Sequence, residues 1–125
     1  MKRLLVTGAA GQIGSDLVPA LRERYGAENV IAAGHTTPLP PDLKDSGPCT
    51  YLDVGNYHQV QQTVAELNID AIFHMSSILS ALAEEDRQRA HRVNIDGLYN
   101  VLEAATTHGL ERVVLPSSIA AFGED

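Results

Sequence analysis

Three glycines follow the apolar run "RLLVT" at intervals of three residues: Gly8, Gly11 and Gly14. After a strand, such glycines allow a tight turn, then the close approach of a pyrophosphate, then close packing of a helix on the strand. The helix that begins there points unpaired N–H groups at the phosphates. We therefore predict a dinucleotide site that also includes Gln12 and Ile13. A glycine-rich turn without a ligand is the alternative.

A second position bears on the same ligand. Dinucleotide folds usually carry an acidic residue about 20 residues beyond the glycines, where it binds the ribose hydroxyls of NAD. Gly34 stands at that place, and residues 30–43 contain no Arg or Lys to bind the 2′-phosphate of NADP. We expect NAD, with NADP the weaker candidate. The adenosine end would be held by His35 or by the hydroxyls of Thr36 and Thr37.

The elements that must position these residues are short apolar runs separated by segments with helical spacing. Strands are predicted at Arg3–Thr7, Asn29–Ala33, Thr50–Leu52, Ala71–Met75 and Arg112–Leu115. Residues 34–49 contain four prolines and two glycines, so we expect a loop there. Strands that alternate with helices and are apolar on both faces are typical of a covered parallel sheet. The prediction is one α/β domain, residues 1–125, with a Rossmann-type doubly wound sheet of about five strands.

Three helices are predicted from apolar spacing and end signals. The first ends at Gly26, and its apolar stripe is Ile13, Leu17, Ala20, Leu21 and Tyr25. The second begins at a capping box of Asn56 and Gln59, and its stripe is Val60, Val64 and Leu67. The longest, residues 83–107, ends before Gly109, and its apolar face is Ile95, Leu98, Leu102 and Ala105.

Composition excludes several classes of partner. Nine basic and sixteen acidic residues give a net charge of −7, which argues against nucleic acid and against anionic membranes. The single Cys49 cannot form an internal disulfide, and no spacing of Cys and His indicates a metal site. No segment has the pattern of a signal peptide or the length of a membrane span. A cytoplasmic protein is expected.

The chain resembles the extended branch of the short-chain dehydrogenase/reductase superfamily, the group of nucleotide-sugar epimerases and dehydratases. The strings that carry this likeness are "VTGAAGQIGSDLVPALRERYG", "YLDV", "IFHMSSILSALAE", "VNIDGLYNVLEAA" and "PSSIAAFG". Among them, "QIGSDLVPALRERYG" and "ILSA" are similar to the short-chain type of L-threonine 3-dehydrogenase. The resemblance implies NAD-dependent oxidation of L-threonine to 2-amino-3-ketobutyrate. A nucleotide-sugar epimerase or dehydratase, and a non-catalytic dinucleotide-binding module, are the alternatives.

The resemblance also implies roles at the cofactor. Asp53 and Val54 match the pair that contacts the adenine. His74, Met75 and Ser76 match the loop that runs beneath the ribose and the nicotinamide. Taken alone, an Asp at such a position could equally cap the next helix, and a histidine at a strand end is more often structural than catalytic.

Further matches concern the substrate. Ser118 matches the serine that hydrogen-bonds the reacting oxygen, with Ser117 as a bystander. Ser80 matches a position near the substrate, and Asn94 matches a structural asparagine of a helix. Taken alone, a Ser-Ser pair at a strand end would be expected to cap or to turn.

The shared mechanism of this group needs a tyrosine that accepts a proton and a lysine four residues further on. The four tyrosines are followed at that spacing by Asn29, Gly55, Gln61 and Glu103. We therefore expect the pair to lie beyond Asp125, in a longer polypeptide. The last predicted strand should leave an apolar face and an open edge, which invite association. The resemblance implies a homodimer that pairs through the long helix.

Overall fold

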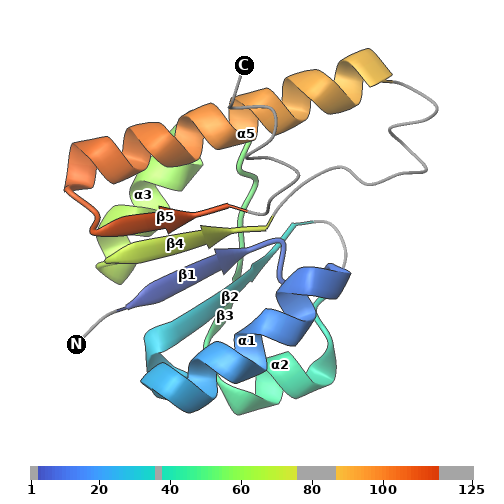
Figure 1. The fold of residues 1–125 in the computed structure, drawn as a ribbon, viewed down its shortest axis with the longest axis vertical. Coiled ribbons are helices and arrows are strands. Elements are labelled where there is room, and N and C mark those ends of the chain that lie inside the picture. The colour runs from blue at the N-terminus through green and yellow to red at the C-terminus, as the bar shows by residue number, and fades with distance from the viewer. Residues whose placement is uncertain (1–2, 36–37, 76–86, 116–125) are drawn as a thin grey trace.

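The computed structural model describes residues 3–35, 38–75 and 87–115, and the side chains of Gln12 and residues 87–94 lie outside that description. Five strands form one parallel sheet in the order β3-β2-β1-β4-β5 (Figure 1). They are β1 (Leu4–Thr7), β2 (Val30–Gly34), β3 (Cys49–Tyr51), β4 (Ala71–His74) and β5 (Arg112–Val114). Each predicted strand is present within one residue at either end, and the predicted α/β class is confirmed.

Helices cover the sheet on both faces, as Figure 1 shows. Helices α1 (Gln12–Tyr25) and α2 (Pro41–Ser46) lie on one face, and α3 (Tyr57–Leu67) and α5 (Arg87–His108) lie on the other. Alternate residues of each strand point to opposite faces. In β1, for example, Leu4 and Val6 belong to the core beneath α1, whereas Leu5 belongs to the core beneath α3 and α5. Both cores are apolar, as a doubly covered sheet requires.

Helix α1 ends as predicted, but its inner face differs from the predicted stripe. Gly26 has φ 97°, a conformation that suits glycine, and its N–H donates to the carbonyl of Arg22. Three residues of the predicted stripe lie in or against the core, namely Leu17, Leu21 and Tyr25, together with Val18 and the buried Arg22. Ile13 and Ala20 are exposed instead, so the stripe is confirmed only in part.

The predicted loop at residues 34–49 is wrong in one respect, because it contains the short helix α2. Pro40 is its N-cap and Pro41 its first residue, where a missing N–H costs no hydrogen bond. Arg22 reaches across from α1, and its guanidinium donates to the carbonyl oxygens of Leu43 at 2.7 Å and Pro48 at 2.6 Å. The buried arginine therefore holds α2 and the segment after it against α1.

Helix α3 begins at Asn56, whose side-chain oxygen accepts a hydrogen bond of 3.0 Å from the N–H of Gln59. This confirms half of the predicted capping box. The other half differs, because the Gln59 side chain accepts from the N–H of Asp53 and not from that of Asn56. The predicted stripe is confirmed: Val60 and Val64 are buried, with Leu67 packed beside the same core.

Helix α5 ends at Gly109, which has φ 63°, as predicted. The predicted apolar face turns only partly toward the protein, because Leu98 and Ala105 are half-buried. The buried residues are Gly97, Asn100, Val101 and Ala104. Ile95 and Leu102 are exposed instead, together with Tyr99. Small side chains face the protein because a carbon on Gly97 would lie 2.9 Å from a methyl group of Val54. The larger apolar side chains are left outside.

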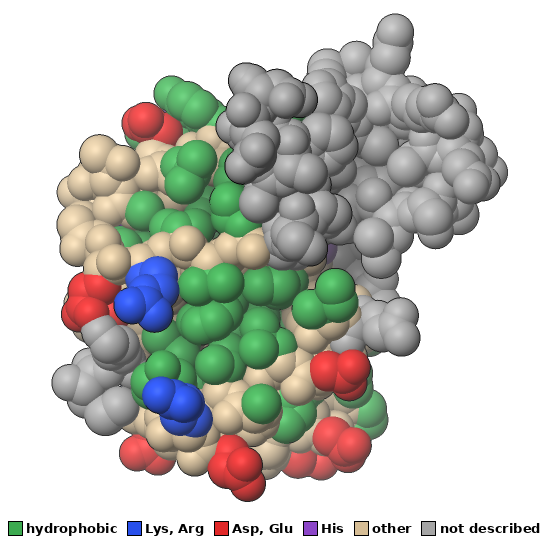
Figure 2. Space-filling model, viewed as in Figure 1, with side chains coloured by type: hydrophobic (Ala, Val, Ile, Leu, Met, Phe, Trp, Pro, Cys, Tyr) green, Lys and Arg blue, Asp and Glu red, His purple; other side chains and the backbone are tan. Residues whose placement is uncertain are grey.

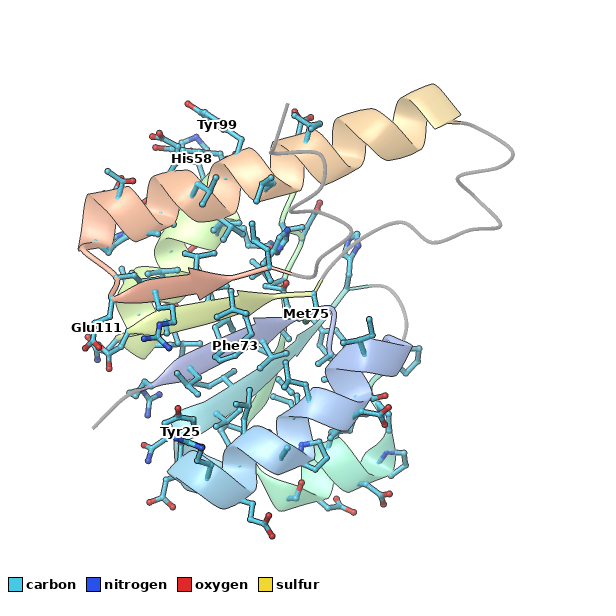
Figure 3. The ribbon with its side chains drawn as sticks, viewed as in Figure 1. Tyr25, His58, Phe73, Met75, Tyr99 and Glu111 are labelled. Atoms are coloured by element: carbon cyan, nitrogen blue, oxygen red, sulfur yellow. The ribbon has the colours of Figure 1, made fainter. Side chains whose placement is uncertain are left out.

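One apolar area remains open on the face that α1 covers. Among the described elements, no helix lies over β4 and β5 on this face. Figure 2 shows hydrophobic side chains gathered there, and Figure 3 labels Phe73, Met75 and Tyr25 on the same face. All three are only partly buried. The expected open face is thus present among the described residues.

No helix in the described part of the chain has the length and apolar character needed to cross a bilayer.

Candidate functional site

The carboxyl ends of the five parallel strands lie along one edge of the sheet, toward the right in Figure 1. The chain passes from β1 to β2 on one side and places β4 on the other side of β1. The helices change faces at the same place. Doubly wound sheets bind their ligands at such a switch point, outside the carboxyl ends of the strands. The glycine-rich turn leaves the sheet here.

The three predicted glycines form this turn, each for a separate physical reason. Gly8 has φ 67°, in the left-handed region that favours glycine. The N–H of Gly11 donates to the carbonyl of Gly8 at 3.0 Å and closes the turn. A carbon on Gly14 would lie 2.2 Å from that carbonyl oxygen, so only glycine fits there. The N–H of Ala9 donates to the carbonyl of Ala33 at 3.0 Å, which ties the turn to β2.

The beginning of α1 carries no anionic group of its own. Its N-cap is Gly11, which has no side-chain cap, and its first turn contains no acidic residue. The first hydrogen bond of the helix runs from the N–H of Ser15 to the carbonyl of Gly11. The N–H groups of Gln12, Ile13 and Gly14 therefore precede the helical ladder and have no carbonyl of their own helix to bond. Together with the helix dipole they favour an anion.

The ends of β1 and β4 are joined by buried polar groups. Oγ1 of Thr7 and Nδ1 of His74 share a hydrogen bond of 2.9 Å, and both residues are buried. The N–H of Met75 donates to Oγ1 of Thr7 at 3.0 Å. Burial lowers the pKa of His74 from 6.5 to about 4, so the ring is neutral near neutral pH. The His74 ring is thus turned into the protein, where it joins the two strands.

The ends of β2 and β3 carry the predicted adenosine contacts. Gly34 and Tyr51 are partners in the parallel register. His35 is exposed, and its Nε2 lies 3.9 Å from Oδ1 of Asp53. That carboxylate oxygen also accepts a hydrogen bond of 2.9 Å from the N–H of Gly55. The structure therefore brings three predicted residues, Gly34, His35 and Asp53, to one end of the sheet edge.

Sequence reasoning missed a residue that holds the segment of Asp53 and Val54 in place. Asn100 of α5 is buried, and its side-chain amide donates to the carbonyl of Val54 at 2.8 Å. Gly97, one turn earlier on α5, lets Val54 approach the helix closely. The signal available in the sequence was the spacing of Gly97 and Asn100, which places a polar side chain beside a glycine on one face of the helix.

Several predicted residues lie outside the described part of the chain. These are Ser76, Ser80 and Ser118, together with Thr36 and Thr37. The side chain of Asn94 is likewise outside it. Within the residues that are described, no group of three or more His, Cys, Asp or Glu side chains is placed to hold a metal ion.

The described residues fit a dinucleotide. Gly11 has an extended backbone at φ −78° and no side chain on the approach to the helix N-terminus. The N–H groups of Gln12, Ile13 and Gly14 are donors of the kind that bind phosphates at the N-terminus of a helix. An acidic chain can bind an anion here because the donors are local backbone groups and not diffuse charge.

Comparison with known proteins finds relatives among L-threonine dehydrogenases and epimerase/dehydratases. A mitochondrial L-threonine 3-dehydrogenase of Bos taurus is 43% identical over 122 residues, which are 98% of this chain and 32% of that protein. An uncharacterized epimerase/dehydratase of Staphylococcus epidermidis is 45% identical over 123 residues, 98% of this chain and 38% of its own length. The crystal structure of L-threonine dehydrogenase from Clostridium difficile superposes with a TM-score of 0.82 at 38% identity, covering 90% of this chain and 35% of that one.

The chain thus spans roughly a third of the length of these relatives. The sequence profile of one family matches residues 4–125, which include the glycine-rich turn, all five strands and the end of the chain. We conclude that the chain belongs to the NAD dependent epimerase/dehydratase family.

Proposed function

We propose that this chain is the NAD-binding part of a dehydrogenase that oxidises the 3-hydroxyl of L-threonine. The observation that carries the proposal is the glycine-rich turn at the switch point, where the N–H groups of Gln12, Ile13 and Gly14 precede the helical ladder. The family and the relatives named as L-threonine dehydrogenases support the reaction class.

In this proposal the pyrophosphate of the dinucleotide lies on the N-terminus of α1. The adenine lies beside Asp53 and Val54, which α5 holds through Asn100. When bound, the nicotinamide accepts a hydride. Thr7 and His74 act as positioning residues, because they fix the strand ends on either side of the switch point. Met75 and Ser76 are proposed, from the family resemblance, to contact the ribose and the nicotinamide.

Ser118 and Ser80 are the proposed hydrogen-bond donors to the substrate oxygen. The proton acceptor is proposed to be a tyrosine outside residues 1–125, because no Tyr in this sequence has Lys four residues further on. Activity is therefore proposed for a polypeptide that extends beyond Asp125. A cytoplasmic location remains a prediction from the sequence.

We also propose that the protein is a homodimer that pairs through α5. Three apolar side chains form a stripe on the outside of this helix: Ile95, Tyr99 and Leu102. They recur at i, i+4 and i+7, so they share one face, opposite the buried Val101 and Ala104. An exposed apolar stripe of this kind suits a contact between helices.

The test uses the reading frame downstream of codon 125 and the polypeptide that it encodes. We expect NADH to form with L-threonine as the substrate. Ser118→Ala should lower kcat by at least about a hundredfold, because the reacting oxygen loses a hydrogen-bond donor. The neighbouring Ser117→Ala is the matched control and should stay within about twofold, since that serine is a bystander. A stop codon after Asp125, with NAD bound and no turnover, would support a non-catalytic module instead.

A further inference from the structure

Gly34 is a glycine for reasons of space and not of backbone conformation. Its φ lies outside the left-handed region. A carbon added to it would lie 3.2 Å from Cγ and Cδ2 of Leu39 and 3.2 Å from Cε1 of Tyr51. Such distances are shorter than ordinary van der Waals contact. A side chain at position 34 would therefore require Leu39 and Tyr51 to shift by a few tenths of an ångström.

Leu39 and Tyr51 are held where they are. Tyr51 lies beside Gly34 in the register of β3 and β2, and its hydroxyl accepts a hydrogen bond of 3.4 Å from the N–H of Leu39. Leu39 is buried in the core beneath α1, whereas Tyr51 is 50% exposed. The tyrosine thus spans the end of β2 and closes the place where a side chain of residue 34 would begin.

A carboxylate at this position would do two things to a bound dinucleotide. It would hydrogen-bond the ribose hydroxyls of NAD, and it would repel the 2′-phosphate of NADP. Gly34 has no carboxylate, and Tyr51 and Leu39 occupy the space beside it, so neither effect is present. Asp53 lies at the same end of the sheet, and its carboxylate oxygen is 3.9 Å from Nε2 of His35. Residues 30–43 supply no Arg or Lys that would favour the phosphate.

We infer that Gly34, closed over by Tyr51 and Leu39, leaves the adenosine end of the cofactor site with little selectivity between NAD and NADP. The inference rests on the proposed function, because it concerns the same dinucleotide. NAD binds somewhat better, since Asp53 is close and residues 30–43 contain no Arg or Lys to offset the added phosphate. The selectivity is small because position 34 carries no carboxylate, and a side chain there would press against Leu39 and Tyr51.

The test measures the dissociation constants of NAD and NADP for the chain by isothermal titration calorimetry. We expect the two constants of the unmodified chain to lie within about tenfold of each other. A preference larger than tenfold for either dinucleotide would overturn the inference. If neither dinucleotide binds, the proposed function is contradicted and this inference falls with it.

Variants then test the closure itself. Gly34→Asp with Tyr51→Val removes the contact with Tyr51 and leaves the contact with Leu39, which requires a shift of a few tenths of an ångström. We expect the preference for NAD to rise by at least about tenfold. Tyr51→Val alone is the matched control, and its ratio of constants should stay within about threefold of the unmodified chain. Circular dichroism establishes that each variant is folded. A folded double variant with an unchanged ratio would refute the assignment of position 34.

Discussion

Oγ1 of Thr7 and Nδ1 of His74 share a hydrogen bond of 2.9 Å at the point where β1 and β4 end side by side. The same hydroxyl accepts a hydrogen bond from the N–H of Met75. Both side chains are buried, so water cannot replace either partner. This pair fixes the two strand ends between which the chain changes direction, next to the glycine-rich turn.

Thr7→Val removes the hydroxyl at nearly constant volume. It leaves Nδ1 of His74 buried without that partner, and we expect a loss of about 1 to 3 kcal/mol in the free energy of unfolding. Urea denaturation measures the loss. Thr107→Val, at an exposed position near the end of α5, is the control and should change stability by less than about 0.5 kcal/mol. Equal effects of the two substitutions would contradict a special role for Thr7.

Stability should fall with acid because of His74. The unfolded state takes up a proton at pH values below 6.5, whereas burial lowers the pKa of the folded state to about 4. The stability that depends on neutral His74 is therefore fully present above pH 6.5 and is lost as the pH falls toward 4. The difference between the two pKa values corresponds to about 3 kcal/mol in the free energy of unfolding. Denaturation curves at several pH values should show a shallower acid slope for His74→Asn than for the unmodified chain. Thr107→Asn, at an exposed position that carries no titratable group, should keep the original slope.

Arg22 is expected to dominate the stability of the α1 side of the sheet. Its guanidinium donates to the carbonyls of Val30, Leu43 and Pro48 from a buried position. Lysine cannot reproduce this planar set of donors, so Arg22→Lys should lose at least about 2 kcal/mol in the free energy of unfolding. The exposed Arg24→Lys should lose less than about 0.5 kcal/mol. A lysine variant as stable as the unmodified chain would show that these hydrogen bonds contribute little.

The proposed dimer is tested by charging the outside of α5. Tyr99 is 58% exposed and Leu102 is 44% exposed, so Tyr99→Glu and Leu102→Glu should leave the fold intact. Sedimentation equilibrium of the unmodified chain should give twice the chain mass of 13.4 kDa, and each variant should give the single mass. Thr107→Glu lies off the stripe and should stay dimeric. A monomeric unmodified chain would contradict pairing through this helix.

Local patterns in the sequence predicted the strands and the helix ends well. Short apolar runs bounded by turn residues have few alternative conformations, and Gly26 and Gly109 take the positive φ that ends a helix. Inner helix faces were predicted less well. On α5, Gly97 and Ala104 face the protein because the helix packs closely, and periodicity of large apolar residues pointed to the exposed stripe instead. On α1, the buried Arg22 is invisible to a hydrophobic pattern.

In the candidate site, too, some residues could be predicted from local sequence and others could not. Gly8, Gly11 and Gly14 were predictable because the turn, the close approach and the packing all depend on neighbours within seven residues. Asn100 and Tyr51 were not, since their partners lie 46 and 12 residues away in the chain. Only the sheet topology brings such residues to the end of the site that is proposed to hold the adenosine.

The most direct test of the central claim is the binding of NAD to the chain, measured by isothermal titration calorimetry with Gly11→Ala as the key variant. Gly11 has extended backbone angles, and an added carbon would lie 3.3 Å from the carbonyl oxygen of Gly8, so the turn must shift by a few tenths of an ångström. Circular dichroism establishes that the variant is folded. We expect the unmodified chain to bind NAD and Gly11→Ala to bind at least about tenfold more weakly, because the methyl group obstructs the pyrophosphate. Ala20→Ser, at an exposed position further along α1, should bind like the unmodified chain. The account is contradicted if the unmodified chain does not bind NAD, or if Gly11→Ala binds it equally well.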